Sequence, residues 1–191
     1  MRPSSNRAVP AGLALAFWVA GVVMAGPGPF SAAHAQSRES LVVAVDWLAT
    51  RLEDPSLVLL HFGQPAEYAK QHIPGARLVG LYDVHLQNAN GLTLEMMPLE
   101  DLRAKLESLG ISDGSRVVVY SATAPAFTQV ARLMFTLDRA GLGGRSAMLD
   151  GGLPAWTRAG HAVTGDVPAD RPGKLSPLTA VAGKTKVMAD A

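Results

Sequence analysis

The stretch PLEDLRAKLESLGISDGSRVVVYSATAPAF, residues 98–127, predicts a helix, a turn, a strand and a loop in direct succession. Its first part places apolar side chains on one helical face and follows them with a glycine: Leu99, Leu102, Leu106, Leu109 and Gly110. Pro98 suits the first position of that helix, where the backbone N–H that proline lacks would have no helical partner. The apolar run at 117–120 then indicates a buried strand.

The same alternation extends to both sides of this stretch. Strands are expected at 41–45, 57–60 and 146–149, and helices at 46–52, 65–70, 127–140 and 153–159, with Asp46 as the N-cap of the first helix. Residues 82–97 show no clear period and are predicted to form an irregular connection containing Asn90-Gly91. The alternation predicts a single α/β domain with a parallel sheet flanked by helices on both faces.

The first 35 residues have the organisation of a secretory signal peptide. Arg2 and Arg7 precede an apolar run at 11–25, and small residues at 33 and 35 suit cleavage after Ala35. The run is interrupted by glycines and is shorter than the roughly 20 residues of a membrane span, which disfavours the alternative of an anchor. The sequence therefore predicts a signal peptide at 1–35, a domain at 40–165 and a linker or tail at 166–191. The expected location is periplasmic or secreted, without a stable membrane anchor after cleavage.

Charge and cysteine content limit the function. The chain has 17 basic and 16 acidic residues, and cleavage after Ala35 would remove two arginines and leave a net charge of −1. A nearly neutral domain without a run of Lys or Arg is not expected to bind nucleic acid or a membrane surface. Cysteine is absent, which excludes disulfides, a thiolate nucleophile and thiolate metal ligands from this chain. No cofactor is predicted.

Ser121 follows the strand at 117–120 and precedes the loop and the next helix. In an open α/β sheet, ligands gather where strands end at their carboxyl edge and helices begin. A serine nucleophile of the hydrolase type would need glycines around it, as in G-x-S-x-G, and Tyr120-Ser121-Ala122 with its neighbours lacks both. A Ser121-dependent hydrolase is therefore a minor alternative to a hydroxyl that caps the loop or the helix.

Four segments in order resemble one known family: HIPGA at 72–76, MPLEDLRAKLESLGISDGSRVVVY at 97–120, ARLMFTLDRAG at 131–141 and LDGGLPAW at 149–156. Together they resemble the rhodanese family of sulfurtransferases over roughly residues 42–163. More narrowly, they resemble the first half of the tandem thiosulfate and mercaptopyruvate sulfurtransferases, whose second half carries the active cysteine. The resemblance implies a rhodanese-like fold and a possible partner in a second rhodanese domain.

The residue at the position of the family's cysteine is Ser121, and the resemblance makes Ser121, Ala122, Thr123, Ala124 and Ala126 a degenerate active-site loop. Serine cannot form a persulfide, and no catalytic residue is therefore predicted. The proline of this loop at 125 removes one N–H donor, and the loop has no glycine, arginine or lysine. Family members often have Asp and Arg after the second strand, where this chain has His61-Phe62.

The histidines at 61, 72, 85 and 161 are candidate bases or metal ligands. None has a partner at i+3 or i+4, and no zinc site is predicted. His72 is assigned to the turn in HIPGA and His161 to the loop after the last helix. His61 is the one that could face the same pocket as Ser121, although a packed or solvated imidazole is the expected role.

Two functions fit these observations. The first is an exported rhodanese-like domain that is inactive as a sulfurtransferase by itself and has a structural, interaction or anion-binding role. The second is the N-terminal half of a tandem thiosulfate/mercaptopyruvate sulfurtransferase, whose active cysteine lies in a missing or separate C-terminal domain.

Overall fold

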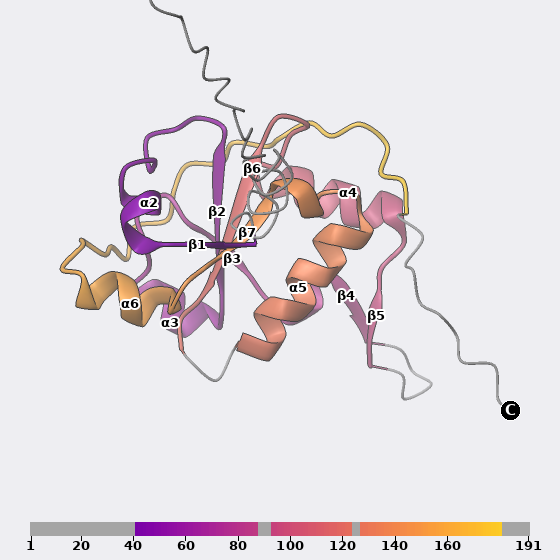
Figure 1. Cartoon of the computed structure of the whole chain (residues 1–191). Helices are drawn as coiled ribbons and strands as arrows, with labels where there is room; N and C mark the ends of the chain where they lie inside the picture. Colours follow the sequence, from indigo (N-terminus) through magenta and orange to yellow (C-terminus); the bar gives the residue numbers. More distant parts are fainter. Residues whose placement is uncertain (1–40, 88–92, 124–126, 181–191) are drawn as a thin grey trace, which may run out of the picture.

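The computed structural model describes residues 41–87, 93–123 and 127–180, and their central element is a parallel sheet (Figure 1). The strand order is β1-β7-β6-β2-β3, and all four neighbouring pairs are parallel. The strands are β1 (Val42–Val43), β2 (Leu57–Phe62), β3 (Arg77–Val79), β6 (Arg116–Ser121) and β7 (Ser146–Leu149). The predicted α/β fold with a parallel sheet is confirmed.

Helices cover both faces of this sheet, as predicted (Figure 1). One face packs against α4 (Leu99–Ser108) and α5 (Phe127–Arg139). The opposite face packs against α2 (Val45–Ala49), α6 (Gly152–Arg158) and the region around α3 (Pro65–Lys70). Because successive side chains of a strand point to opposite faces, β2 and β6 contribute to both cores.

Three local predictions were wrong. The segment predicted to be irregular, 82–97, overlaps a short helix, η1 (Leu81–Asp83), and contains an antiparallel pair of β4 (His85–Gln87) and β5 (Thr93–Met96). These strands are too short to show a period in the sequence, and the predicted turn at Asn90-Gly91 lies outside the described residues. The N-cap of α2 is Ala44, with Asp46 in the first turn, and Pro98 is the N-cap of α4.

Residues 166–180 contain no helix or strand, yet they are held against the domain. Gly173 N–H donates to Glu107 O over 2.7 Å, and Arg77 Nη2 donates to Ala169 O over 3.0 Å. Leu175 is only 4% exposed and joins the core beneath α4 and α5. The segment therefore crosses the amino ends of the strands as a strap, while the boundary predicted at residue 165 stays a prediction.

The predicted signal peptide at 1–35 lies outside the described residues. Within the part of the chain that the structure describes, no helix is long and apolar enough to cross a bilayer.

Candidate functional site

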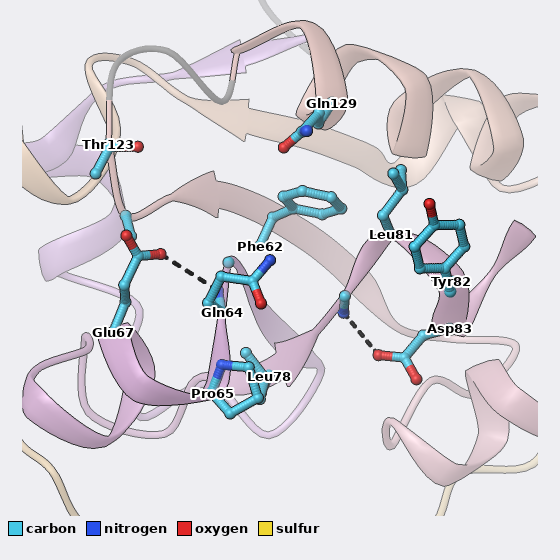
Figure 2. A pocket seen from close by; sticks show the side chains of 13 residues that line it. Phe62, Gln64, Pro65, Glu67, Leu78, Leu81, Tyr82, Asp83, Thr123 and Gln129 are labelled. Atoms are coloured by element: carbon cyan, nitrogen blue, oxygen red, sulfur yellow. Dashed lines mark hydrogen bonds between the residues drawn. The ribbon is translucent and has the colours of Figure 1, made fainter. Parts of the chain in front are cut away.

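A pocket of about 400 Å³ lies at the carboxyl ends of β2, β3 and β6 (Figure 2). Phe62 ends β2, while Gln64 and Glu67 come from the start of α3. The other lining residues are Gly63, Pro65, Leu78, Gly80, Leu81, Tyr82, Asp83, Ala122, Thr123 and Gln129. This is the edge of a parallel sheet where ligands are expected, and the loop after Ser121 forms part of its wall.

Ser121 is the last residue of β6 and is paired in register with Phe62. A side chain at Gly152 would come within 2.8 Å of Ser121 O and 3.1 Å of Ser121 Oγ. Gly152 also has a φ of 56°, a conformation that favours glycine. Glycine at position 152, the first residue of α6, is therefore needed for the close approach of α6 to the end of β6.

The structure places part of the predicted loop at the pocket. Ala122 and Thr123 line it, and Ala122 N–H donates to Phe62 O over 3.4 Å. Ser121 is partly buried beside them, and its hydroxyl forms no hydrogen bond with any described residue. Ala124 and Ala126 lie outside the described residues, so their predicted place in the site stays a prediction.

The charged side chains of the pocket are carboxylates. Glu67 Oε2 accepts from Gln64 N–H over 3.3 Å, and Asp83 Oδ2 accepts from Gly80 N–H over 2.6 Å. Lys105 Nζ lies 2.8 Å from Asp83 Oδ1 and compensates that charge. No Arg, Lys or His is among the described lining residues, and residues 124–126 are Ala, Pro and Ala. Glu67 therefore leaves the pocket with negative potential, which opposes the binding of an anion.

His61 does not line the pocket, so the histidine that could have faced it is instead buried beneath it. Its exposed fraction is 0%, and its Nδ1 lies 3.1 Å from Tyr120 Oη. Tyr120 Oη accepts from Ile73 N–H over 2.9 Å, so the tyrosine hydrogen is available for His61 Nδ1. The remaining proton of the neutral imidazole is then on Nε2, which has no hydrogen-bond partner among the described residues.

Burial, and to a lesser extent the nearby His72, lower the pKa of His61 to about 4, while Glu67 opposes the shift. His61 is therefore neutral near pH 7. Burial also raises the pKa of Tyr120, which stays protonated and able to donate. The His61-Tyr120 pair fixes the turn at Ile73 rather than exchanging protons with the pocket.

The other histidines have structural contacts. His72 Nδ1 lies 2.8 Å from Tyr68 O and His72 Nε2 lies 3.1 Å from Asp166 O, which ties the end of α3 to the strap. His85 Nε2 lies 2.9 Å from Thr136 Oγ1, and the His161 ring packs beside Trp156. Across residues 41–87, 93–123 and 127–180, no three His, Asp or Glu side chains come together as a metal site would require.

Comparison with known families agrees with this geometry. The parallel sheet and the pocket at its carboxyl edge define an α/β domain, and the family model described as Rhodanese-like domain matches residues 44–159. The chain belongs to this family, which confirms the resemblance seen in its motifs.

Its relatives are named as sulfurtransferases. A putative thiosulfate sulfurtransferase from Synechococcus elongatus is 33% identical over 86% of this chain and 51% of its own length. A probable 3-mercaptopyruvate sulfurtransferase from Pseudomonas aeruginosa is 36% identical over 66% of this chain and 48% of its own. The chain thus spans about half the length of these curated relatives.

A solved structure supports the fold alone. The crystal structure of SseA from Escherichia coli, described with the rhodanese fold of 3-mercaptopyruvate sulfotransferases, matches with a TM-score of 0.63 and 22% identity. The match covers 74% of this chain and 55% of SseA.

Sequence reasoning missed the acidic lining of the pocket. Glu67 follows the end of β2 by five positions in the first turn of α3, and Asp83 lies in η1. The position of Glu67 beyond a strand end was a usable signal. No such signal marked Asp83, because residues 82–97 showed no clear hydrophobic period.

Proposed function

We propose that this chain is an exported rhodanese-like domain that does not transfer sulfur by itself and has a structural or interaction role. The observation that carries the proposal is Ser121 at the end of β6, in a chain without cysteine. Sulfur transfer in the family needs a thiolate that accepts a sulfane sulfur, and a serine hydroxyl has no accessible anionic state near neutral pH.

The chemistry of the pocket supports the loss of activity and argues against an anion-binding role. Thiosulfate and mercaptopyruvate are anions, whereas the charged groups among the described lining residues are Glu67 and the compensated Asp83. A binding site for these donors would need cationic side chains or several aimed N–H groups. An interaction role therefore fits the site better than anion binding.

A second candidate is the N-terminal half of a tandem thiosulfate/mercaptopyruvate sulfurtransferase. It is favoured by the match to about half of each relative, 51% and 48% of their lengths. Activity would then come from a cysteine-bearing second rhodanese-like domain, encoded farther along or separately. Sequencing the DNA beyond codon 191 tests this: a rhodanese-like domain with a cysteine loop there supports it, and unrelated sequence counts against it and leaves only the separately encoded arrangement.

The leading proposal is tested by the transfer of sulfur from thiosulfate to cyanide. The purified protein and its Ser121→Ala variant are expected to form no thiocyanate above the rate without protein. Ser121→Cys supplies the missing thiol but leaves the acidic pocket unchanged, so it is also expected to stay inactive. Enzyme-like turnover by the unmodified protein would overturn the proposal, and turnover by Ser121→Cys alone would show that the pocket still accepts the anion.

A further inference from the structure

The buried ring of His72 has a hydrogen-bond acceptor beside each of its two nitrogens. Nδ1 lies 2.8 Å from Tyr68 O, and Nε2 lies 3.1 Å from Asp166 O at the start of the strap. Both partners are backbone carbonyl oxygens, which accept hydrogen bonds and cannot donate them. A neutral imidazole has one N–H, so it satisfies one carbonyl and turns a lone pair toward the other. An imidazolium has two N–H groups and donates to both carbonyls.

The contacts of His72 compensate for the water that a buried charge loses. The residue is 0% exposed, and burial by itself disfavours the charged form of the ring. The Tyr68 ring is stacked on the imidazole, with the ring centroids 3.8 Å apart and the planes inclined by 8°, and the face of an aromatic ring attracts a cation. Hydrogen bonds from a charged donor are also stronger than those from a neutral one. These contacts therefore favour the protonated ring.

The ionisable side chains around His72 come from several elements. On β2, the His61 ring centroid lies 6.4 Å from that of His72, and His61 stays neutral above about pH 5 because its pKa is about 4. His72 lowers that pKa, as a neighbouring cation would. Tyr68 also stays neutral, because burial raises its pKa. The other ionisable residues on the surrounding elements are Glu67 and Lys70 on α3, Arg77 on β3, Tyr120 on β6, His161 after α6, and Asp166.

His72 also joins the chain at the start of the strap through its backbone. His72 N–H donates to Thr164 O over 2.8 Å, and Thr164 N–H donates to His72 O over 2.9 Å. Farther along, Arg77 Nη2 donates to Ala169 O over 3.0 Å, and residues 168–172 contribute a wall to a pocket of about 610 Å³ at the amino ends of β2 and β3. The later part of the strap has its own contacts, such as the bond that Gly173 N–H donates to α4. His72 therefore acts on the attachment of the first part.

We propose that His72 is a pH-sensitive attachment point for the first part of the strap, residues 166–172. Protonation of the ring supplies the second N–H and tightens this segment over the pocket, and deprotonation loosens it. A detached strap lacks the Asp166 carbonyl beside Nε2, so the detached form binds the proton less tightly than the attached form. The attachment is therefore strongest at low pH and weakens as the pH rises through the range in which histidines titrate. The inference goes beyond the proposed function and does not depend on it.

Amide hydrogen exchange of the purified protein at about pH 5.5 and about pH 7.5, on either side of the usual histidine titration, tests this attachment. After correction for the intrinsic effect of pH, Thr164 N–H is expected to exchange about tenfold faster at the higher pH, the effect of one charge-assisted hydrogen bond. Gly173 N–H is the control within the same molecule and should change little. Nitrogen-15 NMR at the lower pH should show both ring nitrogens of His72 protonated.

Two variants identify the titrating group. His72→Gln has an amide NH2 group for the Asp166 carbonyl but does not gain a proton, so the pH dependence at Thr164 should disappear. The matched control is His161→Gln, because His161 lies only three positions before Thr164, and the tenfold change should persist in this variant. Thermal unfolding of each variant verifies that it folds. If His72→Gln does not fold, the nitrogen-15 measurement on the unmodified protein decides.

Equal protection of Thr164 N–H at the two pH values would overturn the inference, and so would a single protonated nitrogen on His72 at the lower pH. A pH dependence that persists in His72→Gln, or disappears in His161→Gln, would also overturn it, because another group would then be the one that titrates.

Discussion

The two faces of the central sheet differ in chemistry although the same strands build them. On the face covered by α4 and α5, β2 and β6 contribute apolar side chains such as Leu60 and Val119, both 0% exposed. The opposite face also has an apolar core, which includes Leu59 and Val118. It is called the polar face here because the residues after Leu60 and Val119 on the same strands are His61 and Tyr120, equally buried. The centroid of the His61 ring lies 5.3 Å from that of Tyr68 and 5.0 Å from that of Tyr120.

The difference separates buried side chains that only pack from buried side chains that must also form hydrogen bonds. Positions such as Leu60 and Val119 on the apolar face need only shape and burial, and many apolar residues would serve there. The polar face depends on particular hydrogen bonds, because a buried polar group without a partner costs free energy. His61 Nε2 is such a group, and it lies beside the pocket. The polar face thus comes next to the pocket at Gly63, while the apolar face reaches the pocket at Phe62.

The largest effect is expected on the apolar face. Leu133→Ala removes a side chain that is 0% exposed on α5 and should lower the free energy of unfolding by about 3 kcal/mol. Urea unfolding at pH 7 measures the change. Phe135→Ala is the control on the same helix, because Phe135 is 62% exposed, and it should have little effect. Equal losses from the two variants would contradict the assignment of this face.

Lowering the pH should destabilise the folded protein through His61, which lies on the polar face. The pKa of His61 is about 4 in the folded protein and 6.5 in the unfolded chain, so the unfolded chain binds more protons between these values. The contribution of neutral His61 to the free energy of unfolding is therefore complete above about pH 7 and is lost as the pH falls to about 4. At about 1.4 kcal/mol per pKa unit it amounts to about 3 kcal/mol.

Urea unfolding at pH 7 and pH 4.5 measures this dependence in the protein and in His61→Phe. The variant should lose less stability on acidification. Some dependence should remain, because burial also lowers the pKa of His85. The same loss in both proteins would show that His61 is not the titrating group.

Removal of the tyrosine hydroxyl from the polar face should have a smaller effect. Tyr120→Phe leaves Ile73 N–H and His61 Nδ1 without their partner, and should lower the free energy of unfolding by about 2 kcal/mol. Tyr82→Phe, at a residue 56% exposed, is the control and should be neutral. A neutral Tyr120→Phe would indicate that water replaces the hydroxyl.

The smallest effect is expected at the margin of the polar face. The Arg116 guanidinium lies 4.8 Å from the Trp47 ring centroid, and Arg51 lies 4.4 Å from the same ring. Arg116→Ala should cost only about 0.5 kcal/mol, because the contact is exposed and Arg51 remains. A loss of 2 kcal/mol or more in thermal unfolding would place this contact among the core interactions.

The main elements could be predicted because their patterns are long. The run at 98–127 predicted α4 and β6 nearly at their observed limits, and glycines with positive φ end α4 and α5, at Gly110 and Gly141. The β4-β5 pair was missed, because its strands have three and four residues. Asp46 was misassigned as an N-cap, because Ala44 takes that position in the extended conformation.

The sequence by itself determined the α/β class, the family and the lack of a sulfur-carrying residue, because these depend on periodicity, on motif order and on which side chains are present. Only the tertiary structure decided that His61 points beneath the pocket, that Glu67 and Asp83 line it and that Lys105 compensates one of them. These relations join residues from different elements. Their chemistry depends on distance and burial, which no local pattern specifies.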